Sequence, residues 1–224
     1  MDWTALGVSI RLSFLTMIVL LLIGTPIAYW LAFSHWRLKF LVEAIVALPL
    51  VLPPTVLGFY ILLSIGPRSP IGSLYRDLTG STLPFSFEGL LLASVLYSMP
   101  FAVQPFASAF ASVDRRLIEA SRCLGSSPWR TFRRVVLPLS LPGMVTGMIL
   151  SFAHTLGEFG VVLMVGGNLA GRTRTASISI YDDVQALNYH AAFHTSLLLL
   201  GVSFAVLAVT YATRRTVWAA WPTK

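Results

Sequence analysis

The residues that could do chemistry in this chain are most concentrated in one short charged segment. Between residues 112 and 138 the sequence holds two acidic residues and six of its 16 basic ones. The arginines of such a segment can bind a soluble partner or lipid phosphates. Enzyme chemistry has no comparable support, because neither a His-Glu-x-x-His metal motif nor a Gly-x-x-x-x-Gly-Lys-[Ser/Thr] nucleotide loop occurs. We therefore expect no catalytic residue, and any ATP hydrolysis must come from a partner.

The histidines and the single cysteine add no second centre. His190 and His194 have i, i+4 spacing, but no carboxylate or third ligand is near them in sequence, so no metal site is expected. Cys123 is the only cysteine, which excludes an internal disulfide.

The composition predicts a polytopic membrane protein. Apolar residues make up 56% of the 224 residues and charged residues only 11%, more apolar sequence than a soluble domain of this size needs. The net charge of +7 would suggest nucleic acid in a soluble protein. The positive-inside rule explains it better here, and aromatic side chains are not interleaved with the basic ones as stacking on bases requires.

Five stretches are long and apolar enough to cross a bilayer, which takes about 20 residues each. They cover residues 8–33, 40–65, 88–110, 136–158 and 193–213. We therefore predict an all-α helix bundle and a single membrane domain over residues 1–224. Eleven basic residues fall on one side of these spans and five on the other. By the positive-inside rule the richer side, which carries segment 112–138, is cytoplasmic, with the N-terminus outside and the C-terminus inside.

Proline and glycine mark two special places in the spans. The pair Pro53-Pro54 must break or kink the second span. Gly143 and Gly147 lie four residues apart in the fourth span, where they either mark a close helix–helix contact or are simply tolerated.

Segment 112–138 is predicted to form a helical hairpin on the membrane surface. Asp114 can cap a first helix, Gly125 suits the left-handed turn that ends it, and Ser127-Pro128 begins a second helix that should end before Pro138. Helical spacing predicts that Glu119 pairs with a neighbouring arginine. It also predicts one apolar stripe, formed by Val113, Leu117, Ala120 and Leu124.

Polar residues inside the spans are candidates for a substrate path. No Lys or Arg sits deep in a span, so the path would offer an ion only weak ligands, of which the candidates are Thr55, Ser98, Gln104, Ser151 and Thr155. The alternative for each hydroxyl is a hydrogen bond to its own helix. The second, third and fourth spans would line the path, whereas the first and fifth would face lipid. On the outer side, Glu158, Arg172 and Arg174 are candidates for contact with a partner protein.

Two motifs at a fixed spacing carry a family resemblance. Glu119-Ala120-Ser121, Gly125 and Val135-Val136-Leu137-Pro138 resemble the EAA loop of ABC-importer permeases, with Ser121 in place of Ala and Val135 in place of Ile. Segments 24–32, 48–58, 62–72, 156–160 and 173–181 extend the similarity to nearly the whole chain, and specifically to molybdate importer permeases. The resemblance implies a type I, MetI-like permease fold. It also implies ATPase coupling through the first hairpin helix, at Leu117, Glu119, Ala120, Ser121, Leu124 and Gly125.

The resemblance also implies the rest of a transport machine. This would be a permease homodimer in a bacterial inner membrane, two cytoplasmic ATPase subunits that bind ATP and Mg, and a periplasmic molybdate-binding protein. The chain itself would bind no cofactor. Sulfate, thiosulfate or tungstate remain alternative substrates, because related permeases share several of these segments. A membrane scaffold that docks a soluble protein without transport is an alternative of a different class, although the polar and proline-broken spans argue against it.

Overall fold

The computed structural model describes residues 2–219, and every regular element in that range is a helix. In chain order the elements are α1 (Trp3–Phe33), α2 (Lys39–Val51), α3 (Pro54–Ile65), α4 (Pro70–Thr79), α5 (Phe87–Ala111), α6 (Arg115–Cys123), α7 (Pro128–Thr131), the π-helix η1 (Phe132–Val136), α8 (Leu137–Leu156), α9 (Gly160–Gly166), α10 (Ala176–Gln185) and α11 (Tyr189–Ala219). The predicted all-α class is confirmed.

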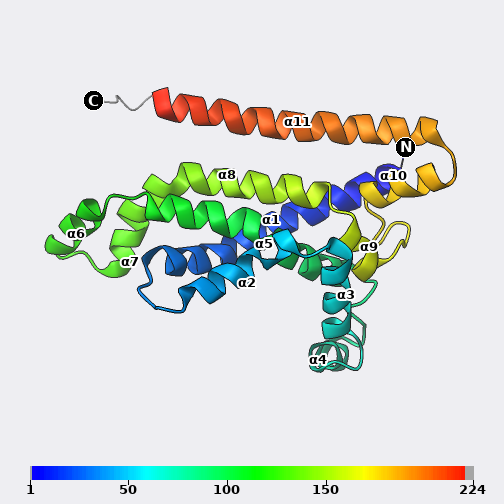
Figure 1. The fold of residues 1–224 in the computed structure, drawn as a ribbon, viewed down its shortest axis with the longest axis horizontal. Helices are drawn as coiled ribbons and strands as arrows, with labels where there is room; N and C mark the ends of the chain where they lie inside the picture. The colour runs from blue at the N-terminus through cyan, green and yellow to red at the C-terminus, as the bar shows by residue number, and fades with distance from the viewer. Residues whose placement is uncertain (1, 220–224) are drawn as a thin grey trace.

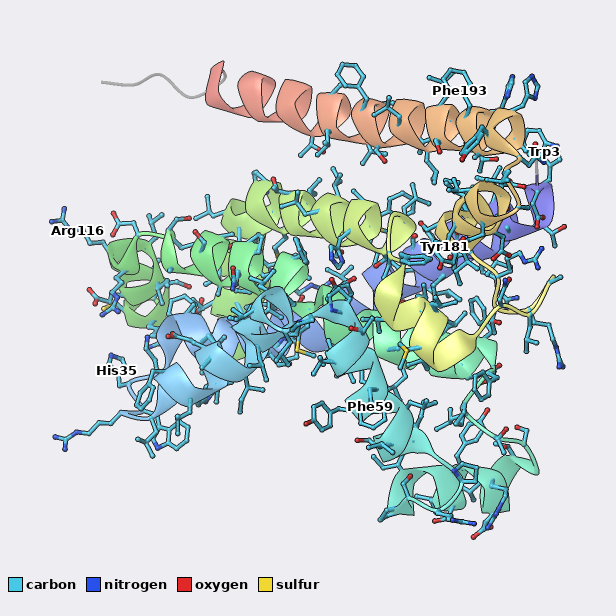
Figure 2. The ribbon with its side chains drawn as sticks, turned by 45° about the vertical axis from the view of Figure 1, so that its right-hand side comes forward. Trp3, His35, Phe59, Arg116, Tyr181 and Phe193 are labelled. Carbon is cyan, nitrogen blue, oxygen red and sulfur yellow. The ribbon has the colours of Figure 1, made fainter. Side chains whose placement is uncertain are left out.

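The long helices run roughly along one axis of the molecule (Figure 1). The helices α6 and α7 lie at one end of it, whereas α4, α9 and α10 lie toward the other. Figure 2 likewise places His35 and Arg116 at one end and Trp3 at the other. The end that carries the hairpin, which the positive-inside rule predicts to be cytoplasmic, is therefore opposite to the end that carries α4, α9 and α10.

Four helical segments are long and apolar enough to cross a membrane. They are Trp3–Phe33, Phe87–Ala111, Pro128–Leu156 and Tyr189–Ala208. The bent pair of α2 and α3 gives a fifth crossing if it is counted as one span. The direction of the helix axis changes by 116° between the two. The predicted break at Pro53-Pro54 is confirmed, because neither proline can donate to the ladder and Leu52 is held in an extended conformation before them.

The core of the bundle is formed by α1, α5 and α8. Phe106 and Phe110 of α5 are fully buried in it together with Leu20 of α1 and Val136 of η1. The sequence suggested that the first span faces lipid, whereas one side of α1 is packed into this core. It also buries the hydroxyl residues Ser9, Ser13 and Thr16. The Ser9 hydroxyl accepts a hydrogen bond from the Ala176 backbone N–H at 2.8 Å, which fixes α10 against α1.

Glycines allow two pairs of helices to approach closely. A Cβ atom built on Gly143 would lie 2.5 Å from the Cβ of Ala109, and one on Gly147 would lie 2.8 Å from the ring of Phe106. The close-contact interpretation of these two glycines is thus confirmed, between α8 and α5. In the same way, a Cβ on Gly160 at the start of α9 would lie 2.8 Å from Pro54 of α3.

The fourth span is longer than the sequence suggested. The hairpin's second helix was expected to end before Pro138, but α7, η1 and α8 continue as one apolar segment from Pro128 to Leu156. The π-helix makes this possible: the Leu137 N–H bonds to the Phe132 carbonyl, five residues back. This wider turn makes room for the Pro138 ring, which would clash with a carbonyl in a regular α-helix.

The last helix, α11, packs only against α10 and α8 among its larger contacts, and Figure 1 shows it lying along one side of the bundle. Phe193, Leu200 and Phe204 are exposed on it. The expectation that the fifth span faces outward from the bundle agrees with this placement.

Candidate coupling hairpin and the polar residues between α5 and α8

The first helix of the hairpin, α6, has both of the predicted end signals. The Asp114 carboxylate accepts the Arg116 backbone N–H at 2.9 Å. At the other end Gly125 has a φ of +77°. Its N–H bonds to the Arg122 carbonyl at 2.9 Å, and the Ser126 N–H bonds to the Ser121 carbonyl at 3.1 Å. These two bonds form a Schellman motif, which satisfies carbonyls that the helix would otherwise leave unpaired.

The apolar stripe of α6 differs from the expected one. Ile118 is the residue that anchors the helix to the bundle, at 9% exposure, in the same cluster as Val113 and Val136. Leu117 and Leu124 point away from the bundle and are 49% and 86% exposed. Because Leu117 and Leu124 are seven residues apart, which is about two helical turns, they share one outward face. This face is free to receive another protein.

The charges of the hairpin are also more available than expected. Glu119 was predicted to pair with an arginine, but it makes no ion pair with any residue in the range that the structure describes. The tie between α6 and α7 is instead a neutral one, between the hydroxyls of Ser121 and the buried Thr131 at 3.0 Å. Ser121 therefore holds the hairpin together, and Glu119 remains open to a partner.

A buried network of polar side chains joins α5 to α8. The Ser98 hydroxyl lies 2.8 Å from the Thr155 hydroxyl and 2.9 Å from Nδ1 of His154. The His154 ring stacks on Phe101 with 3.9 Å between the ring centroids. His154 was missed as a member of this network. Its only signal in the sequence was its place beside Thr155, whereas the contact with Ser98 spans 56 residues.

The five candidate path residues fall into two groups. Ser98, Ser151 and Thr155 are buried inside the chain, and the last two donate to carbonyls of their own helix, those of Met148 and Ser151. The alternative of a hydrogen bond within the helix therefore holds for them. Thr55 and Gln104 are exposed. Gln104 lines a cavity of about 560 Å³ between α1, α2 and α5, beside the Lys39–Glu43 ion pair.

The three outer candidates also lie in different surroundings. Arg174 is engaged: its Nε donates to Asn168 at 2.6 Å, and its terminal nitrogens lie 3.6 Å from Asp182 and 3.8 Å from Asp2. Arg172 is exposed and lines a cavity of about 860 Å³ together with Arg11. Of the three, Arg172 has the most accessible side chain.

Glu158 is only 4% exposed, so it offers no surface to a docking protein in this conformation. Neither of its carboxylate oxygens has a hydrogen-bond partner in the described range. The Ser94 hydroxyl lies near the carboxylate and likewise has no hydrogen-bond partner in the described range. A buried carboxylate without a partner destabilises the fold.

This burial predicts that Glu158→Gln makes the purified protein more stable. The amide keeps the size of the side chain and removes the cost of burying an anion, so we expect a gain of about 1 kcal/mol or more. The gain should be larger at alkaline pH, because only the glutamate then has to be buried in its charged form. Thermal unfolding of both proteins across a pH series measures the difference. A less stable glutamine variant would show that the carboxylate has a partner.

The described residues hold no group of three or more metal-binding side chains. What the geometry provides is a capped, outward-facing helix at one end of a membrane bundle, with polar residues along its inner helices.

Comparison with known proteins agrees with this description. Residues 24–217 match the family of binding-protein-dependent transport system inner membrane components. The chain is 50% identical over 214 residues to the molybdenum transport system permease protein ModB of Azotobacter vinelandii, covering 96% of this chain and 95% of the relative. It is 38% identical over 184 residues to ModB of Escherichia coli K12, covering 82% and 80%. A chain of the MetNI methionine ABC transporter has the same fold, with a TM-score of 0.73 at 19% identity over 95% of this chain and 94% of that one. The chain therefore belongs to the family of inner membrane components of binding-protein-dependent transport systems.

Proposed function

We propose that this protein is the membrane-spanning subunit of an ATP-driven importer and forms the path by which molybdate crosses the bacterial inner membrane. The observation that carries the proposal is the near full-length similarity to the molybdenum permease of Azotobacter vinelandii. The exposed face of α6 supports it, because a permease without a nucleotide loop needs a surface that receives force from an ATPase.

In this proposal two copies of the chain assemble with two cytoplasmic ATPase subunits and a periplasmic molybdate-binding protein. ATP and Mg are bound by the ATPase, and this chain binds no cofactor. The coupling residues are those on or beside the outward face of α6 and its terminal turn, namely Leu117, Glu119, Ala120, Ser121, Leu124 and Gly125. The N-terminus is periplasmic and the C-terminus cytoplasmic, which places α6 beside the ATPase. Arg172 would contact the binding protein.

The path itself would bind the anion only weakly. Molybdate carries two negative charges, and a tight site in the bilayer would need buried Arg or Lys. The exposed Thr55 and Gln104 would face the path between the two copies. The buried network around Ser98, Ser151 and Thr155 would hold α5 and α8 together behind it. Weak ligands allow the anion to leave, so selectivity would come from the external binding protein.

Uptake into proteoliposomes tests this function. The permease, its ATPase and the binding protein should accumulate labelled molybdate only when ATP is present, with tungstate and sulfate as competitors. Gln104→Trp should lower uptake by about tenfold or more, since it fills the path without entering the core. Phe204→Trp on the exposed face of α11 is the matched control and should transport normally. A complex that binds its ATPase and transports none of the three anions would favour the scaffold alternative.

A further inference from the structure

An apolar groove of about 670 Å³ lies between α1 and the segment from α7 to α8, and the proposed function does not use it. Its walls come from Leu21, Pro26 and Tyr29 on one side and from Trp129, Phe132 and Met144 on the other. Tyr29 and Phe132 close its inner side, with their ring centroids 5.1 Å apart in an edge-on arrangement. The groove opens on the outer surface of the bundle, so in the membrane an apolar group of a neighbouring molecule would cover it.

The position of the groove matches one leaflet of the bilayer. It begins at Leu21, twelve residues before the end of α1 at Phe33. At the rise of an α-helix this is about 18 Å, close to half of a hydrocarbon core of about 30 Å. The groove therefore runs from near the middle of the membrane to the end of the bundle that carries the hairpin. A single acyl chain of that leaflet has the length to fill it.

Exposed arginines adjoin two aromatic residues that line the groove. Arg130 directly follows Trp129, and Arg133 and Arg134 directly follow Phe132; all three are exposed, and none makes an ion pair with a residue in the described range. Both Trp129 and Phe132 line the groove, so the backbone of Arg130 and Arg133 lies directly beside residues of its wall. Trp129 itself is 68% exposed and stacks on Phe132 at 5.5 Å. Tryptophan and arginine at the end of an apolar span are typical of the headgroup level.

We propose that this groove is a binding site for an anionic phospholipid of the cytoplasmic leaflet. One acyl chain lies against Leu21, Tyr29 and Phe132, and the phosphate is held by Arg133, with Arg130 beside it. A second copy of this chain fits the groove less well in a two-fold contact, because it would bring the same three arginines to the same mouth. The proposal rests on the membrane location of the chain and not on the identity of the transported anion.

Lipid retention tests the proposal. The complete importer is reconstituted in nanodiscs of phosphatidylcholine with a minor fraction of phosphatidylglycerol, then extracted gently, and the bound lipids are identified by mass spectrometry. Arg133→Gln should lower the retained phosphatidylglycerol about fivefold, the equivalent of about 1 kcal/mol for one arginine at a membrane surface. Thr25→Trp, which fills the groove, should lower it by a similar factor. Arg116→Gln on α6 and Ile23→Trp on another face of α1 are the controls and should retain it.

Three results would overturn the proposal. The first is phosphatidylglycerol retained equally by Arg133→Gln and by the unaltered protein. The second is phosphatidylcholine retained as well as phosphatidylglycerol, which would show a lipid shell without headgroup recognition. The third is a cross-link between two permease copies in a Thr25→Cys, Cys123→Ser variant, which would show that a second chain covers the groove. None of these results depends on whether molybdate is transported.

Discussion

Gly125→Val is expected to lower molybdate uptake by about tenfold or more, while the ATPase still hydrolyses ATP. Gly125 has a φ of +77° and donates the N–H that helps to end α6. A β-branched residue resists this left-handed conformation, at a cost of about 1–2 kcal/mol or more. The Schellman motif would open, and the face that carries Leu117 and Leu124 would lose its fixed orientation. ATP hydrolysis and uptake measured on the same proteoliposomes give the coupling ratio.

The matched control for this change is Gly125→Asn. A Cβ atom at position 125 meets no atom within 4 Å, so the valine acts through backbone conformation and not through a clash. Asparagine adds a side chain but tolerates the left-handed region, so it should keep most of the coupling. Normal uptake by the valine variant, with a normally assembled complex, would mean that α6 does not transmit the movement.

Gly147→Leu should lower the midpoint of thermal unfolding by about 5 °C or more and reduce the yield of assembled protein. A Cβ on Gly147 would lie 2.8 Å from the ring of Phe106 and 3.1 Å from the Ala102 carbonyl oxygen. Phe106 is fully buried, so it has no free space to move into. Overpacking of this kind costs about 1–3 kcal/mol, which corresponds to several degrees in a chain of this length.

The control for this prediction is Gly7→Leu, which places the same substitution on α1. A Cβ atom on Gly7 meets nothing within 4 Å. The measurement is the fraction of monodisperse protein in size-exclusion chromatography after heating in detergent. Equal stability of the two variants would contradict the close packing of α5 against α8.

Several features of this protein were determined by the sequence alone, because they depend on short-range chemistry. The apolar runs are long enough to require a membrane, and Pro53-Pro54 cannot continue a helix whatever surrounds it. The ends of α6 follow from Asp114 and Gly125 for the same reason: a cap and a left-handed turn are made by residues a few positions apart. The family resemblance could also be read from the sequence, because it rests on residue types at a fixed spacing between positions 119 and 138.

The tertiary structure decided which side each helix turns to the core. In a membrane, lipid is as apolar as the protein interior, so the hydrophobic pattern of a span does not show its buried face. For this reason the apolar run of α1 favours a lipid-facing helix, although α1 lies in the core. On α6, outside the spans, the sequence favours Leu117 on the buried stripe, but the packing of the hairpin against the bundle selects Ile118. The contact of Ser98 with His154 also has no local signal in the sequence, and neither does the continuation of α7 and η1 into α8 at Pro138. The first depends on two residues distant in sequence that meet when α5 packs against α8. The second depends on a helical turn that widens to accommodate Pro138.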